Sequence, residues 1–153
     1  MRMQFFGDSY DVVKRFLIHT VAPDAKWTVF PMFTHEVAAA DIFAFEAFLG
    51  VSVASPHAMT SSTDRASHLS VLADHRHIFL DPDIGIKLKP SNGSDAVKYV
   101  FGPELVALCE QSPDRLLLVF ELILSLSMPL CFLAGRSSTS AGVTTIRTTS
   151  GVV

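Results

Sequence analysis

The chain has 153 residues and is 49% hydrophobic, with a mean hydropathy of +0.38, a formal net charge of -3 and a pI near 6.0. These values exclude wholesale disorder and predict about one domain with a buried core. They also exclude nonspecific nucleic-acid binding over a broad basic surface, which leaves only a local basic site open.

The first predicted element is a helix that begins at Asp8 or Ser9, either of which can serve as its N-cap, and ends near Val21. Asp11 and Arg15 are spaced i,i+4 on it, which favours an ion pair on the surface. Apolar residues at helical spacing predict its inward side: Val12, Val13, Phe16, Leu17 and Val21.

Strand and helix patterns then alternate along the chain. The sequence predicts a strand over 27–30, a helix over 37–49 closed by Gly50, a helix over 64–74 capped by Ser62 or Thr63, and a strand over 78–80. In the helix over 64–74 we expect Leu69, Leu72 and Ala73 to face inward.

The following segment, 84–95, contains glycine, proline and asparagine and predicts a mobile connection. Gly102 and Pro103 then favour the start of a helix over 104–111, and 116–120 is a second uniformly apolar strand. Two strands that are apolar on both faces, joined through a helix, are typical of a parallel sheet. We therefore expect an α/β fold of three layers, with a mostly parallel sheet and helices on both of its faces.

Asp81 and Asp83 directly follow the strand over 78–80 and are separated by a proline. Ligands of open α/β sheets bind beyond the carboxyl ends of the strands. Paired carboxylates at such a place can hold Mg²⁺ or Mn²⁺ for phosphoryl transfer, or accept a hydrogen bond from a substrate amine or ribose. Alternatively, Asp81 caps a neighbouring helix and Asp83 is a solvated turn residue.

Other residues are candidates for the same site. Lys98 would contact a phosphate or orient Asp83 if the connection before it folds over the crevice, and Glu104 lies near a helix start. His35 follows the first strand, so it is a candidate base or metal ligand at the same sheet edge. Gly7 to Tyr10 either binds an anion through free N–H groups or simply caps the first helix.

The composition changes sharply near Phe120. Residues 122–153 contain no acid, and they are first apolar and then rich in serine and threonine. We expect a domain over 1–121 followed by an atypical tail over 122–153, which is either a non-native continuation, for example from a frameshift, or part of a membrane segment. Residues 116–135 meet the length rule for a membrane span, although Glu121 and a proline count against one.

The cysteines and the first residues favour a cytoplasmic location. Cys109 and Cys131 show neither metal-ligand spacing nor a disulfide framework, which fits a reducing compartment. Residues 1–8 contain no apolar segment of the length that a signal peptide needs. The alternative is a membrane location through 116–135.

Three segments, 6–15, 79–85 and 98–100, together resemble an uncharacterised family of bacterial and phage-associated proteins. These proteins have a helix that starts with Gly-Asp, a strand that ends in Asp-Pro-Asp-x-Gly, and Lys-Tyr-Val before a helix. The resemblance covers roughly residues 4–120 and implies no particular reaction.

More remotely, Asp81 and Pro82 are similar to the Asp-Pro start of the catalytic loop of amino-methyltransferases, which contacts the target amine. This chain departs from that pattern by having Asp83 and Ile84 in place of a second proline and an aromatic residue. It also lacks a glycine-rich cofactor loop after its first strand.

The sequence thus leaves three functions open. The first is a metal-dependent enzyme acting on nucleic acid or nucleotides, in which Asp81 and Asp83 bind Mg²⁺ or Mn²⁺ and Lys98 contacts a phosphate. The second is a noncatalytic binding or accessory domain, in which Asp81 and Asp83 only shape a loop. The third is a small protein anchored in a membrane through 116–135.

Overall fold

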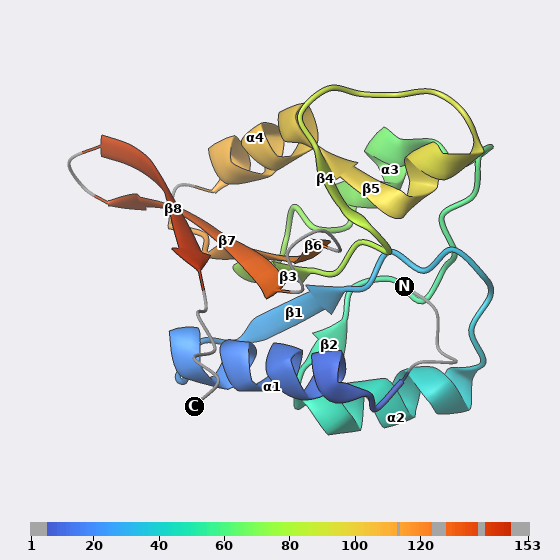
Figure 1. Ribbon diagram of the computed structural model, residues 1–153, viewed down its shortest axis with the longest axis horizontal. Coiled ribbons are helices and arrows are strands. Elements are labelled where there is room, and N and C mark those ends of the chain that lie inside the picture. The colour runs from blue at the N-terminus through green and yellow to red at the C-terminus, as the bar shows by residue number, and fades with distance from the viewer. Residues whose placement is uncertain (1–5, 113, 124–127, 138–139, 148–153) are drawn as a thin grey trace.

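The computed structural model of the chain describes residues 6–112, 114–123, 128–137 and 140–147. Figure 1 shows the arrangement of the elements and labels all of them except the 3-10 helix η2. In chain order they are α1 (Ser9–Val21), β1 (Trp27–Phe30), α2 (Ala39–Leu49), β2 (Ser52–Val53), α3 (Arg65–Ser70), β3 (His77–Leu80), β4 (Gly85–Lys87), η2 (Ser94–Lys98), β5 (Tyr99–Phe101), α4 (Gly102–Gln111), β6 (Leu117–Ile123), β7 (Met128–Ser137) and β8 (Ser140–Arg147).

The main sheet has the strand order β2-β1-β3-β6-β7-β8. Strands β2, β1, β3 and β6 are parallel, with Thr28 opposite both Ser52 and Ile78, and Leu80 opposite Val119. Strands β7 and β8 extend the sheet in antiparallel fashion. The predicted α/β fold with a mostly parallel sheet is therefore confirmed.

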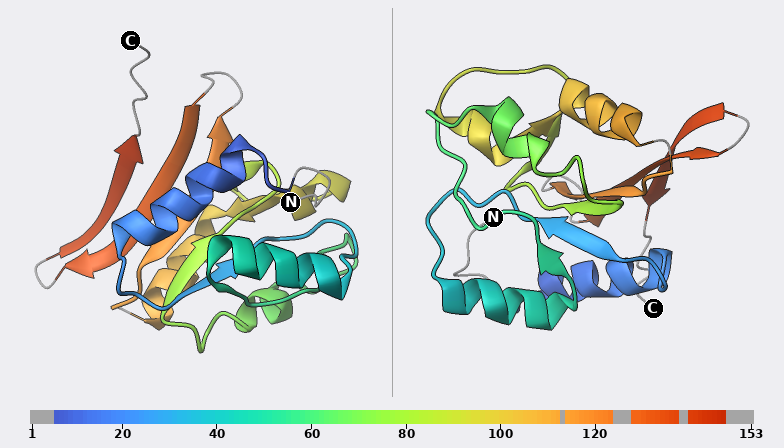
Figure 2. Two further views of the ribbon diagram at one scale, coloured as in Figure 1. Left: turned by 90° about the horizontal axis from the view of Figure 1, so that it is seen from below. Right: turned by 180° about the vertical axis from the view of Figure 1, so that it is seen from behind.

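The parallel strands carry a separate apolar cluster on each face. Val29, Phe79 and Leu118 pack with Leu17 of α1 and Phe45 of α2. The second cluster contains their neighbours along the strands, together with residues of α3 and α4: Phe30, Ile78, Leu80, Leu117, Val119, Leu69 and Leu108. Because successive side chains of a strand point to opposite faces, α1 and α2 lie on one face of the sheet and α3 and α4 on the other (Figures 1 and 2).

Helix α1 begins as predicted but buries a different side. Its N-cap is Asp8, and the helix buries Asp11, Lys14, Leu17 and Ile18. By contrast, Val12 and Phe16 are 55% and 62% exposed, so their predicted inward orientation is wrong.

The predicted surface pair between Asp11 and Arg15 is also wrong. Asp11 pairs with Lys14 instead, and the Arg15 guanidinium lies 5.5 Å from the ring centroid of Phe48. The side chain of Asp11 is therefore buried and is not part of the solvated surface.

Helix α2 ends as the sequence predicts, at Gly50. This glycine has a φ of 73° and donates its N–H to the carbonyl of Glu46. Helix α3 is shorter than predicted and is capped by Asp64, whose Oδ1 accepts from the N–H of Ala66, so neither predicted cap residue takes that place. Leu69 and Leu72 are buried as expected, whereas Ala73 is exposed.

The predicted mobile connection over 84–95 contains regular structure. Strand β4 pairs in parallel with β5 to form a second, two-stranded sheet. Gly85 at the start of β4 has a φ of 151°, and a Cβ atom added there would lie 2.7 Å from Cγ of Glu121. The short sheet therefore lies directly against β6, with no room for a side chain at Gly85.

Residues 116–135, considered above as a membrane span, contribute β6 and β7 over their described part. In the portion of the chain that the structure describes, no helix combines the length and the apolar character needed to cross a membrane. Strand β6 runs across the predicted boundary at residue 121, and residues 128–134 of β7 pair with it. The described part of the tail thus continues the main sheet.

Candidate functional site

The carboxyl ends of β1 and β3 lie at a topological switch point. From the carboxyl end of β1 the chain passes through α2 to β2 on one side, and from the carboxyl end of β3 it passes through α4 to β6 on the other side. The two helices lie on opposite faces of the sheet, so a crevice is expected where the strand order reverses, and ligands of open α/β sheets bind at such a crevice. Asp81 lies at this point, and its N–H donates to the carbonyl of Phe30 at 3.0 Å.

Asp81 belongs to a buried ionic cluster that links β3 to α1. Its Oδ2 lies 2.8 Å from Nζ of Lys14, and the same ammonium lies 3.0 Å from Oδ1 of Asp11. Both carboxylate residues are only 2% exposed, and Lys14 is 6% exposed. The ammonium also lies 5.1 Å from the ring centroid of Phe120, which adds a cation–π contact.

The charges of this cluster depend on one another. Burial acts to lower the pKa of Lys14, but the neighbouring Asp81 and Asp11 outweigh it and raise that pKa, so the side chain stays an ammonium at neutral pH. Burial raises the pKa of Asp81, and Lys14 acts in the opposite direction. Removing one partner of a buried pair leaves an uncompensated charge and typically costs about 3–5 kcal/mol, so the cluster strongly couples α1 to the sheet.

The start of α1 uses its N–H groups within the protein. Oδ1 of Asp8 accepts from the N–H groups of Tyr10 and Asp11 at 2.9 and 3.1 Å, and Oδ2 of Asp11 accepts from the N–H of Gly7 at 2.8 Å. The capping interpretation of 7–10 is therefore confirmed. These N–H groups already have acceptors, so they do not support an anion site there.

The second predicted carboxylate, Asp83, follows Asp81 in the half-buried turn before β4. The backbone of Lys98 contacts that turn, because its carbonyl accepts from the N–H of Ile84 at 2.9 Å. Its ammonium, however, pairs with Oδ1 of Asp95 at 2.6 Å on the same 3-10 helix. The structure thus assigns the Lys98 side chain a local partner on η2.

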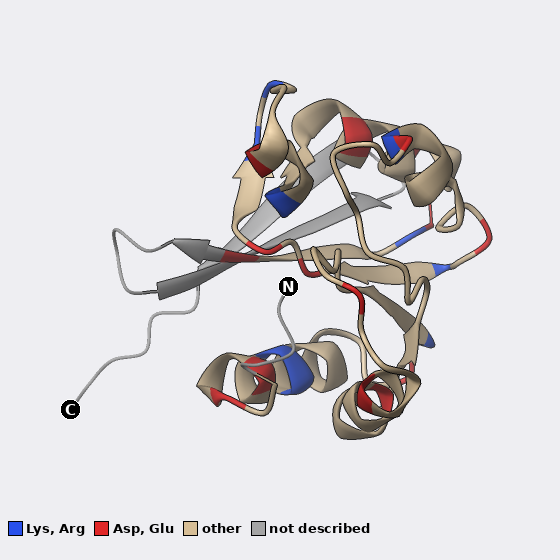
Figure 3. Ribbon diagram, turned by 90° about the vertical axis from the view of Figure 1, so that its right-hand side faces the viewer, with Lys and Arg blue, Asp and Glu red and all other residues tan. Residues whose placement is uncertain are grey.

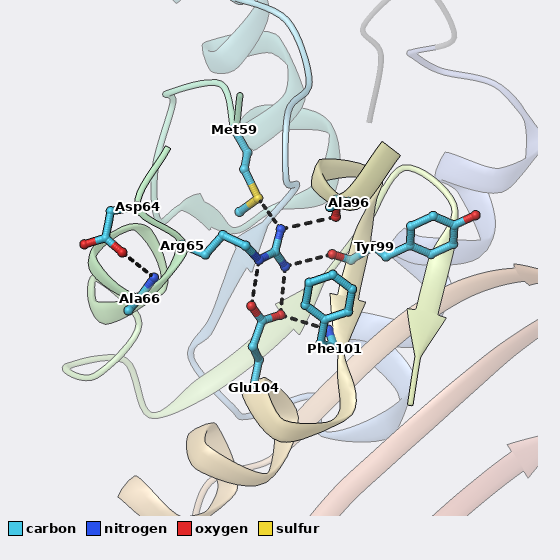
Figure 4. Close-up of polar contacts among 8 residues, drawn as sticks. All are labelled: Met59, Asp64, Arg65, Ala66, Ala96, Tyr99, Phe101 and Glu104. Carbon is cyan, nitrogen blue, oxygen red and sulfur yellow. Dashed lines mark hydrogen bonds and ion pairs between the residues drawn. The ribbon is translucent and has the colours of Figure 1, made fainter. Parts of the chain in front are cut away.

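Glu104 is part of a separate polar cluster around Arg65 (Figure 4). Its two carboxylate oxygens accept from Nε and Nη2 of Arg65, both at 2.8 Å, and Oε2 also accepts from the N–H of Phe101. Arg65 further donates to the carbonyls of Ala96 and Tyr99. The pair of Arg65 and Glu104 therefore connects α3, η2, β5 and α4.

The histidines occupy different places. His35 follows β1 as predicted and is exposed, with Nδ1 3.1 Å from the hydroxyl of Thr34. His77 lies at the opposite end of the strands, where its Nδ1 accepts from the N–H of Leu116. Among the residues that the structure describes, no group of three or more His, Cys, Asp or Glu side chains is arranged to hold a metal ion.

Sequence reasoning missed three residues at this sheet edge: Asp11, Lys14 and Glu121. The spacing of Asp11, Lys14 and Ile18 could have revealed the buried side of α1, because residues three and seven positions apart share a helix face. Glu121 directly follows the apolar run 116–120 and lies within β6, and its Oε1 accepts from the N–H of Ile86 at 3.2 Å.

Figure 3 views the molecule from the side toward which β1 points, where Asp and Glu positions occur on several neighbouring segments. Comparisons with protein-family models, with curated proteins and with solved structures found no match. The resemblance of residues 4–120 to the uncharacterised family and that of Asp81 and Pro82 to amino-methyltransferases therefore stay predictions.

Proposed function

We propose that the chain is a divalent-metal-dependent enzyme that acts on nucleotides or nucleic acid at the carboxyl edge of β1 and β3. Asp81 and Asp83 are the proposed ligands of Mg²⁺ or Mn²⁺. The observation that carries the proposal is the placement of a buried carboxylate, Asp81, at the topological switch point of a parallel sheet.

Charge supports this assignment. Asp11 and Asp81 share the single ammonium of Lys14, so the buried cluster has two carboxyl groups for one cation. Carboxylate oxygens are the ligands that Mg²⁺ prefers, and a bound divalent ion would neutralise phosphate oxygens of a substrate. The net acidity of the chain is compatible with a phosphate substrate when such an ion lies between the two.

Lys98 keeps its proposed role as a phosphate contact only if its pair with Asp95 opens. That pair is accessible to water, with side chains 29% and 69% exposed, and exposed pairs of this kind are weak. An incoming phosphate could therefore compete with Asp95 for the ammonium.

The second candidate function is a noncatalytic binding or accessory domain. The ion pair between Lys14 and Asp81 favours it as well, because this 2.8 Å contact attaches α1 to the end of β3. In this interpretation Asp81 serves the fold and binds no metal.

Calorimetric titration of the full chain with Mg²⁺ and with Mn²⁺ tests the first function. We expect binding by the wild type and its loss in Asp83→Asn and in Asp81→Asn/Asp83→Asn. The matched control is Asp24→Asn, which removes an exposed carboxylate in the turn before β1 and should leave binding unchanged. A folded wild type that binds neither ion would contradict the metal-dependent function and favour the binding domain.

A further inference from the structure

The Lys14 ammonium occupies a cation position between two carboxylates of different elements. Its Nζ lies 2.8 Å from Oδ2 of Asp81 at the end of β3 and 3.0 Å from Oδ1 of Asp11 on α1. All three side chains are buried, so solvent ions do not screen their interaction. Carboxylate oxygens are also the ligands of hard divalent ions, so two carboxylates that face one cation supply two of the six or more oxygen ligands that such an ion takes.

A divalent ion and the ammonium cannot share this position. Two cations within about 4 Å of each other repel strongly where water is excluded, so an ion bound to Asp81 would push the ammonium of Lys14 away. The divalent ion would also compensate both carboxylates, whereas the ammonium compensates only one.

We infer that Lys14 competes with divalent cations for Asp81, so that cation binding releases the polar attachment of α1 to β3. This inference rests on the proposed function, because it describes how the metal site of that function is regulated. Leu17 and Ile18 keep α1 packed on the sheet, so the helix stays folded when the ammonium leaves. By linkage, any change that strengthens the contact between Lys14 and Asp81 lowers the affinity for the metal.

The chain offers a matched control for this role. Lys26 is exposed directly before β1, whereas Lys14 is buried and pairs with Asp81. Replacing either lysine by methionine removes the charge and keeps most of the side-chain length. A difference between the two variants therefore reports on the contact with Asp81.

Calorimetric titration with Mn²⁺ tests the competition in the wild type and four full-length variants. We expect Lys14→Met to bind Mn²⁺ at least about tenfold more tightly than the wild type, a gain of about 1.4 kcal/mol. Lys14→Arg and Lys26→Met should keep the wild-type affinity. Lys14→Met/Asp11→Asn should lose the gain, because one of the two carboxylates is then gone.

Equal or weaker binding by Lys14→Met than by a wild type that binds Mn²⁺ overturns the competition and leaves the proposed function standing. Tight binding by Lys14→Met alone supports the competition while the proposed function of the wild type fails. No binding by either protein overturns both.

Lys14→Met could lose its fold without metal, because it leaves two buried carboxylates without a counter-ion. In that event we expect Mn²⁺ to restore a cooperative thermal transition, followed by circular dichroism. An unfolded variant that Mn²⁺ does not restore overturns the competition.

Discussion

At the scale of single residues, buried or half-buried charges decide how the pieces of this fold attach to one another. Lys14 connects α1 to the end of β3, and Arg65 connects α3 to η2, β5 and α4. Both side chains also lie near an aromatic ring, with the Arg65 guanidinium carbon 4.4 Å from the ring centroid of Phe101. Each cation therefore combines several contacts that no apolar residue could replace.

Substitution of Arg65 by methionine should destabilise the protein. The change leaves the half-buried carboxylate of Glu104 without its bidentate partner and removes the donors to two backbone carbonyls. We expect a loss of about 1–3 kcal/mol in the free energy of unfolding, measured by urea denaturation. Lys98→Met, which removes an exposed pair, should leave the urea midpoint unchanged. Equal stability of Arg65→Met and the wild type would show that the Arg65 cluster contributes nothing to the fold.

At the scale of secondary structure elements, local sequence signals located most of the helices and strands. The strand at 27–30 and the start and end of α1 were predicted as found, because an apolar run and an N-cap act within a few residues. Strands β4 and β5 were missed, since each has three residues and forms only by pairing with the other. Such short strands leave no periodic pattern that sequence analysis can detect.

Substitution of Gly85 in β4 should destabilise the protein. Substitution by alanine forces a side chain onto a φ of 151° and brings a Cβ atom to 2.7 Å from Glu121, whose Oε1 accepts from Ile86. We expect a loss of about 1–3 kcal/mol in unfolding free energy, measured by thermal and urea denaturation.

Gly93→Ala is the matched control for this substitution. Gly93 also has a positive φ, of 105°, but no atom lies within 4 Å of an added Cβ. If Gly85→Ala loses more unfolding free energy than Gly93→Ala, the difference is therefore the cost of displacing Glu121. Equal losses would mean that Glu121 moves aside freely and that backbone strain accounts for the whole effect.

At the scale of the whole molecule, stability should fall as the pH drops below the ordinary histidine range. Burial lowers the pKa of His68 below its usual 6.5, and burial together with Arg76 lowers that of His77. Nε2 of His68 is buried and has no hydrogen-bond partner among the residues that the structure describes. A lowered pKa in the folded state means that the unfolded state binds more protons. The stabilisation is therefore complete above pH 6.5 and is lost as the pH falls through the folded-state pKa.

Urea denaturation between about pH 7.5 and about pH 5 measures this dependence, whose limit is about 1.4 kcal/mol per pH unit for one proton. We expect His68→Gln to flatten the decline, because glutamine does not titrate. His35→Gln, at an exposed position, should keep the wild-type slope. An unchanged slope in His68→Gln would show that His68 does not contribute to the decline.

The sequence by itself determined the α/β class, most helix and strand positions, and the placement of Asp81 just beyond a buried strand. Those features depend on hydrophobic periodicity, capping and strand ends, which are local properties of the chain. Tertiary structure decided the order of the strands, the switch point beside β1, and the pairing of Asp81 with Lys14 across 67 positions. The physical reason is that a buried charge is stable only beside a partner, and which partner reaches it depends on how distant segments pack.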